Sequence, residues 1–195
     1  GLPAQVTLLH DIAFNRSNSD LAFVADSFIY RTTNLTASTP AWTKIDSSGK
    51  KIMAMHSAFG NSNRLYYITN DQMIHVSNNA LSSTPTFATY NLPNTTNNRA
   101  SITSIKSNAD IVYVTCNTKT YKSTDGGATW TNITYNLPST NHIKILADEY
   151  SPTNELVFVA ASNTVYYKTG NANTWTIFNT NLPTRTEAID MSIYN

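Results

Sequence analysis

Short apolar runs alternate with polar segments, rich in Asn and Thr, along the whole chain. Four of these runs, at residues 21–24, 65–68, 111–114 and 156–159, consist of aliphatic and aromatic side chains without a polar interruption. Such runs are typical of strands that are buried on both faces, and no segment shows helical periodicity. The pattern therefore predicts an all-β chain of short strands joined by tight turns.

The apolar runs belong to a repeat of fixed length. The tripeptide Asn-Leu-Pro occurs at 91–93, 136–138 and 181–183, an interval of 45 residues, and Gly-Leu-Pro stands at 1–3. A fixed period of this size indicates a repeat array with one supersecondary unit in each repeat.

Each repeat contains four predicted strands. The first strands are predicted at 8–14, 52–59, 102–106 and 143–147, and the second strands are the four apolar runs. The third strand ends in a shared signature, which reads Tyr30-Arg31-Thr32, Tyr121-Lys122-Ser123 and Tyr167-Lys168-Thr169, and is degraded to His75-Val76-Ser77 in the second repeat. The fourth strand opens with a large aromatic residue, which is Trp42, Phe87, Trp130 or Trp175.

Four short antiparallel strands in about 45 residues match one blade of a β-propeller. We predict blades at 1–46, 47–91, 92–136 and 137–181, with 182–195 supplying the first strand of a further blade at 187–194. Four blades and one extra strand exceed the sixteen strands of a closed four-bladed ring. We therefore expect one propeller region that forms an arc of a larger propeller; a two-sheet sandwich and a closed four-bladed ring are the alternatives.

Composition narrows the classes of partner. Charged residues make up 13% of the chain, the formal net charge is +1, and Lys and Arg are scattered, so nucleic acid is not expected as a ligand. No stretch approaches the roughly 20 apolar residues that cross a bilayer. Cys116 is the single cysteine, which excludes an internal disulfide, and its strand context predicts a buried structural thiol. The first residue is Gly1, without an initiator Met or a signal segment, so we expect the chain to be cut from a longer protein.

One turn carries a motif that identifies a family. Residues 123–130 read Ser-Thr-Asp-Gly-Gly-Ala-Thr-Trp, which resembles the complete Asp-box, or bacterial neuraminidase repeat, of sialidases, sortilin-type receptors and many secreted bacterial propellers. The carboxylate of Asp125 can accept hydrogen bonds from its own hairpin, and Gly127 can adopt backbone angles closed to other residues. The resemblance implies a structural role for Ser123, Asp125, Gly127 and Trp130, away from the ligand-binding face.

Other repeats carry altered copies of this motif. Residues 169–175 are one residue shorter and lack the Asp, and residues 32–42 contain an insertion. The resemblance implies a propeller from a secreted or cell-surface bacterial protein.

A catalytic role has to meet the requirements of glycoside hydrolysis, which in most families needs two carboxylates beside the bond. Sialidases, which the motif resembles, also use three arginines and a Tyr–Glu pair, and the Arg-Ile-Pro type of segment that opens their domains is absent here. Arg31 occupies a repeat position equivalent to Lys122 and Lys168, and Asp148-Glu149 is interpreted as a solvated strand end. We therefore predict no catalytic residue in this chain.

Metal and cofactor chemistry is not predicted either. His10, His56 and His142 lie in or beside first strands, which line the central channel of a propeller. They could converge on a metal, but we interpret them as polar channel residues. No phosphate loop or Ser-His-Asp spacing is present.

Two functional hypotheses remain. The first is a non-catalytic module that recognises or adheres to a glycan or a protein, with the rest of a larger propeller or other subunits as further partners. The second is part of a propeller glycoside hydrolase of the sialidase or xyloglucanase kind, with its catalytic residues elsewhere. For either one, the resemblance places ligand contacts on the face built by second-to-third strand turns and inter-blade connectors. The candidate binding residues there are Asp26, Asp71, Arg99, Asn117, Asn163 and Arg185.

Overall fold

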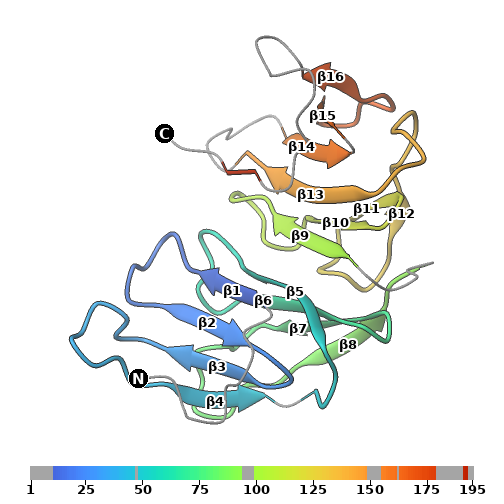
Figure 1. Ribbon diagram of the computed structural model, residues 1–195. Coiled ribbons are helices and arrows are strands. Elements are labelled where there is room, and N and C mark those ends of the chain that lie inside the picture. The colour runs from blue at the N-terminus through green and yellow to red at the C-terminus, as the bar shows by residue number, and fades with distance from the viewer. Residues whose placement is uncertain are drawn as a thin grey trace. The chain divides into compact units, whose positions relative to one another are not determined.

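The computed structural model describes residues 11–46, 48–93, 99–148, 155–161, 163–178 and 191–192. These residues form four antiparallel sheets of four strands each, and none of them is helical. Figure 1 shows the arrangement of the strands. In every sheet the strand order follows the chain, so each strand pairs with the next. The prediction of an all-β chain built from four-stranded propeller blades is confirmed.

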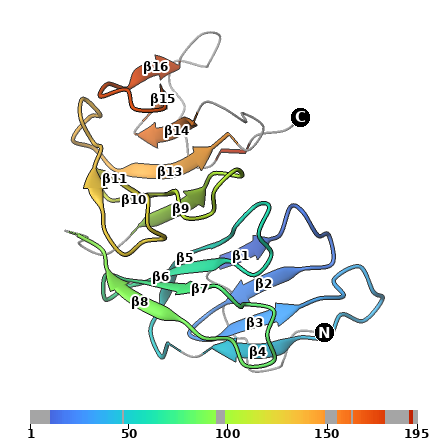
Figure 2. The ribbon, with the colours of Figure 1, turned by 180° about the vertical axis from the view of Figure 1, so that it is seen from behind.

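The strands are short, and each blade is one meander. Blade 1 comprises β1 (Asp11–Phe14), β2 (Ala22–Ala25), β3 (Ile29–Thr32) and β4 (Thr43–Asp46), and blade 2 comprises β5 (Ile52–Ser57), β6 (Leu65–Thr69), β7 (Met73–Ser77) and β8 (Ala88–Asn91). Blade 3 comprises β9 (Ala100–Ser104), β10 (Val112–Cys116), β11 (Lys119–Ser123) and β12 (Thr131–Asn132), and blade 4 comprises β13 (His142–Ala147), β14 (Leu156–Ala161), β15 (Thr164–Thr169) and β16 (Thr176–Phe178). Figure 2 shows the same meanders from behind.

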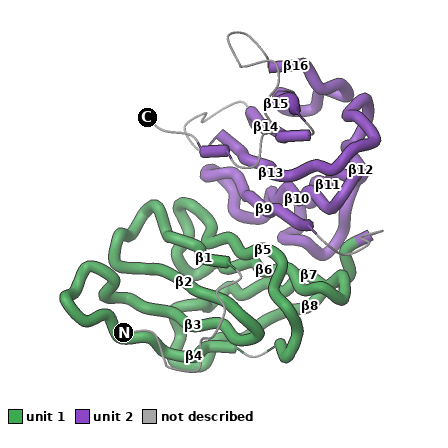
Figure 3. The backbone as a smooth tube through the Cα atoms, viewed as in Figure 1, with its two compact units in different colours: residues 1–92 green, residues 93–195 purple. Residues whose placement is uncertain are grey.

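The chain divides into two compact units, coloured separately in Figure 3. Unit 1 covers residues 1–92 and contains blades 1 and 2; unit 2 covers residues 93–195 and contains blades 3 and 4. Within each unit the first strands of the two blades are neighbours, β1 beside β5 and β9 beside β13. The predicted blade boundaries at 46, 91 and 136 stay a prediction, and the predicted strand at 187–194 lies outside the described residues apart from Met191 and Ser192.

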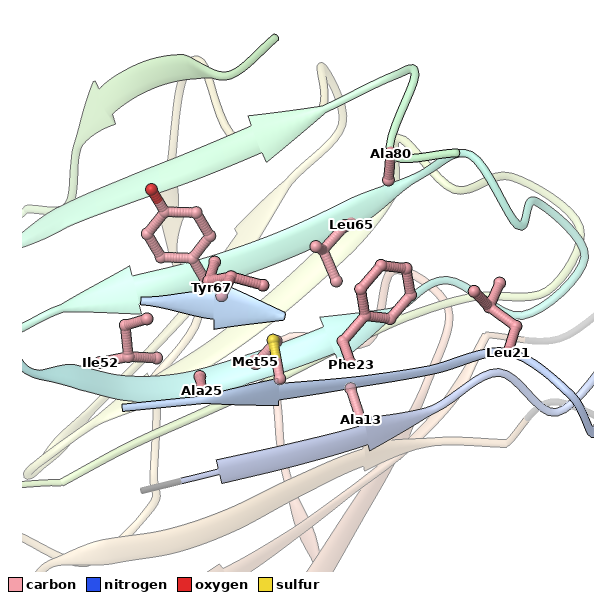
Figure 4. Packing of buried hydrophobic residues seen from close by; sticks show 10 residues of the cluster. Ala13, Leu21, Phe23, Ala25, Ile52, Met55, Leu65, Tyr67 and Ala80 are labelled. Atoms are coloured by element: carbon pink, nitrogen blue, oxygen red, sulfur yellow. The ribbon is translucent and has the colours of Figure 1, made fainter. Parts of the chain in front are cut away.

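The core of unit 1 lies between its two blades. Phe23 of β2 packs against Met55 of β5 and Leu65 and Tyr67 of β6, all of them buried (Figure 4). Every residue of β2, β6 and β10 is buried, because a second strand has strands on both sides and sheet faces that are both covered. This explains why the second strands read as uninterrupted apolar runs.

One copy of the Asn-Leu-Pro marker, at residues 136–138, contributes to the core of unit 2. The backbone N–H of Trp175 donates to Asn136 Oδ1 at 2.7 Å, and Asn136 Nδ2 donates to the Trp175 carbonyl at 2.9 Å. Trp175 is only 3% exposed, and its Nε1–H donates to the Ile133 carbonyl at 2.8 Å. Leu137 is buried in the same cluster. The marker at the end of blade 3 therefore clamps the large aromatic residue of blade 4.

The Asp125 hairpin, residues 123–130, is held by its own side chains. Asp125 Oδ1 accepts from the Thr129 backbone N–H at 2.8 Å and Oδ2 from the Thr129 hydroxyl at 2.6 Å, while Ser123 Oγ donates to Oδ1 at 2.8 Å. The hydrogen bonds from Thr129 are the main cause that lowers the Asp125 pKa to about 2. The Gly127 N–H donates to Ser123 Oγ at 2.8 Å, and Gly127 has a φ of 98°. A carboxylate used in this way holds a turn.

The same hydrogen-bond pattern occurs in blades 1 and 2, where an Asn replaces the Asp. Thr32 Oγ1 donates to Asn34 Oδ1 at 2.9 Å, and Asn34 Oδ1 also accepts the backbone N–H of Ala41, the residue before Trp42. Ser77 Oγ donates to Asn79 Oδ1 at 3.1 Å, and Thr86, the residue before Phe87, donates its backbone N–H to the same oxygen. Sequence reasoning missed the copy in the second repeat because its loop is longer and contains no Asp.

The pairing register corrects the repeat alignment in blade 4. Lys168 stands opposite Val157 on the face toward blade 3, is 4% exposed and lies over the Trp175 ring, 5.8 Å from its centroid. Lys122 instead stands opposite Tyr113 on the face toward the next blade. The expected equivalence of Lys168 with Arg31 and Lys122 is therefore wrong, because a slip of one residue along a strand reverses the face.

The expected aromatic start of each fourth strand also needs correction. Each aromatic residue immediately precedes its strand and ends the hairpin loop. Trp130 is only half-buried, and its buried Nε1 has no hydrogen-bond partner among the described residues, unlike Trp175. A full burial energy is therefore expected for Trp175 and not for Trp130.

Candidate functional site

An open hollow of about 400 Å³ lies in unit 2, between the loops of blades 3 and 4. It is lined by one cation, several hydroxyls and amides and one aliphatic side chain, which are Arg99, Thr118, Ser139, Thr140, Asn141, Ile143 and Asn163. The volume falls within the range of small-ligand sites, about 300–1,000 Å³. None of these lining residues is an Asp or a Glu.

The backbone of Asn117 ties the walls of the hollow together. Asn117 and Thr118 form the turn between β10 and β11, and Asn117 has a φ of 50°, a left-handed conformation that Asn tolerates better than most residues. Its N–H donates to the Arg99 carbonyl at 3.3 Å, and its carbonyl accepts the N–H of His142 at 2.5 Å. This one turn residue therefore joins the segment before β9 to the start of β13.

Three of the six predicted binding residues meet at this hollow. Arg99 and Asn163 line it, and Asn117 adjoins the lining residue Thr118. Asp26 and Asp71 lie at the corresponding turns of unit 1, and Arg185 lies outside the described residues. Sequence reasoning pointed to the connectors but did not single out Ser139, Thr140 and Asn141, whose only signal was their place after Asn-Leu-Pro.

The two aspartates of unit 1 are engaged in their own turns. Asp26 Oδ1 accepts the Phe28 N–H at 2.6 Å, and Asp71 Oδ1 accepts the Thr69 hydroxyl at 2.6 Å. Asp71 also lies 4.0 Å from the Lys50 ammonium, where both side chains are exposed. These carboxylates hold turns, so their assignment to ligand binding stays a prediction.

His142 lies directly behind the hollow, next to the lining residues Asn141 and Ile143. Its side chain is completely buried, with Nε2 3.1 Å from the Pro138 carbonyl and Nδ1 2.9 Å from the Thr120 hydroxyl. A carbonyl can only accept, so Nε2 carries the proton and Nδ1 accepts from Thr120 in the neutral ring. The expectation that His142 is a polar channel residue is wrong; it fixes the connector that carries Ser139 and Asn141.

We expect stability to fall as the pH drops below the ordinary His pKa of 6.5, because burial lowers the pKa of His142 in the folded chain. The unfolded chain then takes up a proton that the folded chain resists, so unfolding is favoured by acid. Urea unfolding at pH 7 and pH 5 measures this difference. His142→Gln should reduce it, and His75, whose pKa burial also lowers, accounts for part of the remainder. An unchanged pH difference in His142→Gln would contradict this role.

Two buried tyrosines donate hydrogen bonds to carboxylates of neighbouring blades, Tyr113 to Glu155 and Tyr67 to Asp46. Burial and the adjacent carboxylate raise the pKa of both phenols, so they stay protonated. Tyr113 is 0% and Tyr67 1% exposed. A protonated, inaccessible phenol cannot attack a substrate, and these pairs link blades.

Neither the single thiol nor the possible metal ligands of the described residues form a reactive site. Cys116 is buried, as predicted, and burial raises the pKa of its thiol to about 12. In the described part of the chain, no three His, Cys, Asp or Glu side chains gather where they could hold a metal ion. No helix in that part is long and apolar enough to span a bilayer.

The four meandering blades define the class of the protein, a β-propeller. The family model of the DUF6242 β-propeller domain matches residues 37–195, and the chain belongs to this family. A comparison with curated proteins gave no match.

Solved structures agree on the fold. An ancestral GH74 enzyme superimposes with a TM-score of 0.64 at 19% identity over 88% of this chain, and the GH74 xyloglucanase from Xanthomonas campestris with 0.67 at 15% over 90%. YCF48 bound to a D1 peptide gives 0.57 at 9% over 87%. The chain spans 25%, 31% and 53% of these proteins, respectively. Identities this low show the fold alone, and the set includes both hydrolases and a peptide-binding protein.

Proposed function

We propose that this chain is a non-catalytic recognition module that binds a glycan in the hollow of unit 2. The observation that carries the proposal is the lining itself, in which Arg99, Asn141 and Asn163 stand among hydroxyl side chains. Hydroxyls and amides both donate and accept hydrogen bonds, which suits the many hydroxyls of a sugar.

The size of the hollow favours a saccharide over a protein partner. A stable protein interface buries about 800 Å² on each side, whereas about 400 Å³ holds only a few sugar units or a short peptide end. We place the module outside the cell or on its surface, because the Asp125 hairpin resembles the motif of secreted propellers. Other parts of a larger propeller or other subunits complete its set of partners in this proposal.

The likeness to GH74 enzymes favours a second candidate, a segment of a glycoside hydrolase. That reaction needs two carboxylates beside the bond, and the lining of the hollow contains none. If this candidate holds, the catalytic carboxylates lie in other parts of the protein, and the hollow holds a sugar of the same substrate chain.

A glycan array run beside a panel of chromogenic glycosides tests both candidates. We expect retention of a glycan without release of the chromophore, and Asn141→Ala should weaken binding about 3- to 10-fold, since one hydrogen bond contributes about 0.5–1.5 kcal/mol. Asn173→Ala, at an exposed turn on the opposite end of blade 4, is the matched control. Hydrolysis of a glycoside would favour the second candidate, and retention unaffected by Asn141→Ala would place the site elsewhere.

A further inference from the structure

We propose that the hollow of unit 2 takes an acidic saccharide, whose carboxylate or sulfate group binds at Arg99. This inference rests on the proposed function and names the class of its ligand. It is carried by the distribution of charge in unit 2, by a difference between the two units, and by the state of Arg99.

The described carboxylates of unit 2 gather at one of its two ends, together with Lys106, Lys122 and Lys168. The antiparallel strands place the segment before β9, the β10–β11 turn, the β12–β13 connector and the β14–β15 turn at one end, where the hollow lies. Arg99 and Lys119 are at this end. The four described carboxylates of the unit are all at the opposite end, and they belong to Asp110, Asp125, Asp148 and Glu155. A ligand approaching the hollow therefore meets positive charge, with none of the described carboxylates nearby.

The equivalent end of unit 1 has the opposite character. Its β2–β3 and β6–β7 turns carry Asp26 and Asp71, where the matching turns of unit 2 carry Asn117 and Asn163. An amide can donate an N–H to an anion, whereas a carboxylate repels it. Because the matching turns carry amides in unit 2 and carboxylates in unit 1, unit 2 is the one that can accept a negatively charged ligand.

Arg99 supplies the cation for such a ligand. It is exposed, lines the hollow, and forms no ion pair with any described residue. A guanidinium presents a planar fork that matches carboxylate and sulfate oxygens, and a charged hydrogen bond contributes about 1.5–3 kcal/mol. Thr118, Ser139 and Asn141 line the same hollow with groups that suit sugar hydroxyls.

Three galactose-based probes isolate the contribution of charge: oligogalacturonides, sulfated galactan oligosaccharides and neutral galactan oligosaccharides. We expect isothermal titration calorimetry to give at least about tenfold tighter binding of an acidic probe than of the neutral one, and a loss of this difference at high salt. Preference for the first or the second probe identifies carboxylate or sulfate as the group recognised.

Two variants test the site directly. Arg99→Ala should weaken acidic binding about 10- to 100-fold. The nearly isosteric Asn163→Asp introduces the residue type found at Asp71 in unit 1, so we expect it to fold and to weaken acidic binding at least about tenfold. It should weaken acidic binding more than neutral binding, because the new charge repels only the acidic probe. Arg16→Ala removes an exposed cation in unit 1 and should change neither. Thermal unfolding of each variant shows whether its fold is intact.

The outcomes separate the inference from the proposed function. If the array and the probes retain neutral glycans as well as acidic ones, and Asn163→Asp has no effect, the inference fails and the recognition module stands. If the protein retains no glycan of either kind, both fail. If acidic binding persists in Arg99→Ala and in Asn163→Asp, the acidic ligand binds elsewhere and the inference fails.

Discussion

Replacing Trp175 with Ala should lower the free energy of unfolding by about 3–5 kcal/mol, the usual cost of deleting a fully buried large aromatic side chain. Trp175 is 3% exposed and packs in the core between blades 3 and 4. Loss of the indole N–H would also leave the Ile133 carbonyl without the donor of its hydrogen bond. Urea unfolding monitored by circular dichroism measures the loss.

Two matched changes show that burial, and not ring size, sets this cost. Trp130→Ala should cost less, because Trp130 is half-buried and its N–H has no partner among the described residues. Phe178→Ala should cost less than about 1.5 kcal/mol, because its ring is 45% exposed. Equal losses for Trp130 and Trp175 would contradict the difference in packing between the two blades.

Replacing Glu155 with Ala should destabilise the chain by about 2–4 kcal/mol, since it leaves cations without a counter-charge at a partly buried site. Glu155 accepts hydrogen bonds from the Lys122 ammonium at 2.5 Å and from the Tyr113 hydroxyl, and the buried Lys168 lies close enough to interact with it. The Glu155 side chain is 22% exposed, which keeps the expected loss below that of a fully buried pair. Lys50→Ala, which breaks an exposed pair with Asp71, should cost less than about 0.5 kcal/mol.

The contribution of Glu155 should also depend on pH. Burial raises the pKa of its carboxyl, but the hydrogen bonds from Lys122 and Tyr113 and the charges of Lys122 and Lys168 outweigh this and lower the pKa below 4.5. A carboxyl with a lowered folded-state pKa stabilises the fold above its unfolded pKa and loses this effect as the pH falls through the folded value. Wild-type and Glu155→Ala stabilities should therefore converge in acid. A gap that stays constant from pH 7 to pH 3 would contradict the ion pair.

Only some of the residues that line the hollow could be predicted from the sequence. Arg99 and Asn163 could be predicted because their place in the repeat puts them at inter-blade connectors and second-to-third strand turns. Asp26 and Asp71 occupy the same places, and no local feature shows that their carboxylates bond to their own turns. Ser139, Thr140 and Asn141 are ordinary polar loop residues, and the hollow that they line forms only when blades 3 and 4 pack together.

The sequence by itself determined the blade, because each of its signals is local or periodic. Uninterrupted apolar runs predict strands covered on both faces, and the 45-residue interval of Asn-Leu-Pro sets the size of the repeat. The Asp125 hairpin could be interpreted from eight consecutive residues, since the hydrogen bonds that the Asp125 side chain accepts come from within them.

Only the tertiary structure decided on which face of its sheet each side chain lies and which repeats contain the same kind of hydrogen-bonded hairpin turn. Tyr167-Lys168-Thr169 matches Tyr121-Lys122-Ser123 in letters, but strand pairing sets Tyr167 opposite Phe158 and turns Lys168 toward blade 3. Asn79 has the role in blade 2 that Asp125 has in blade 3. Its loop is longer, so the spacing of the motif in the sequence does not reveal this equivalence. Side chains alternate between faces at every residue, so an uncertainty of one position leaves the face undetermined until the neighbouring blade fixes the register.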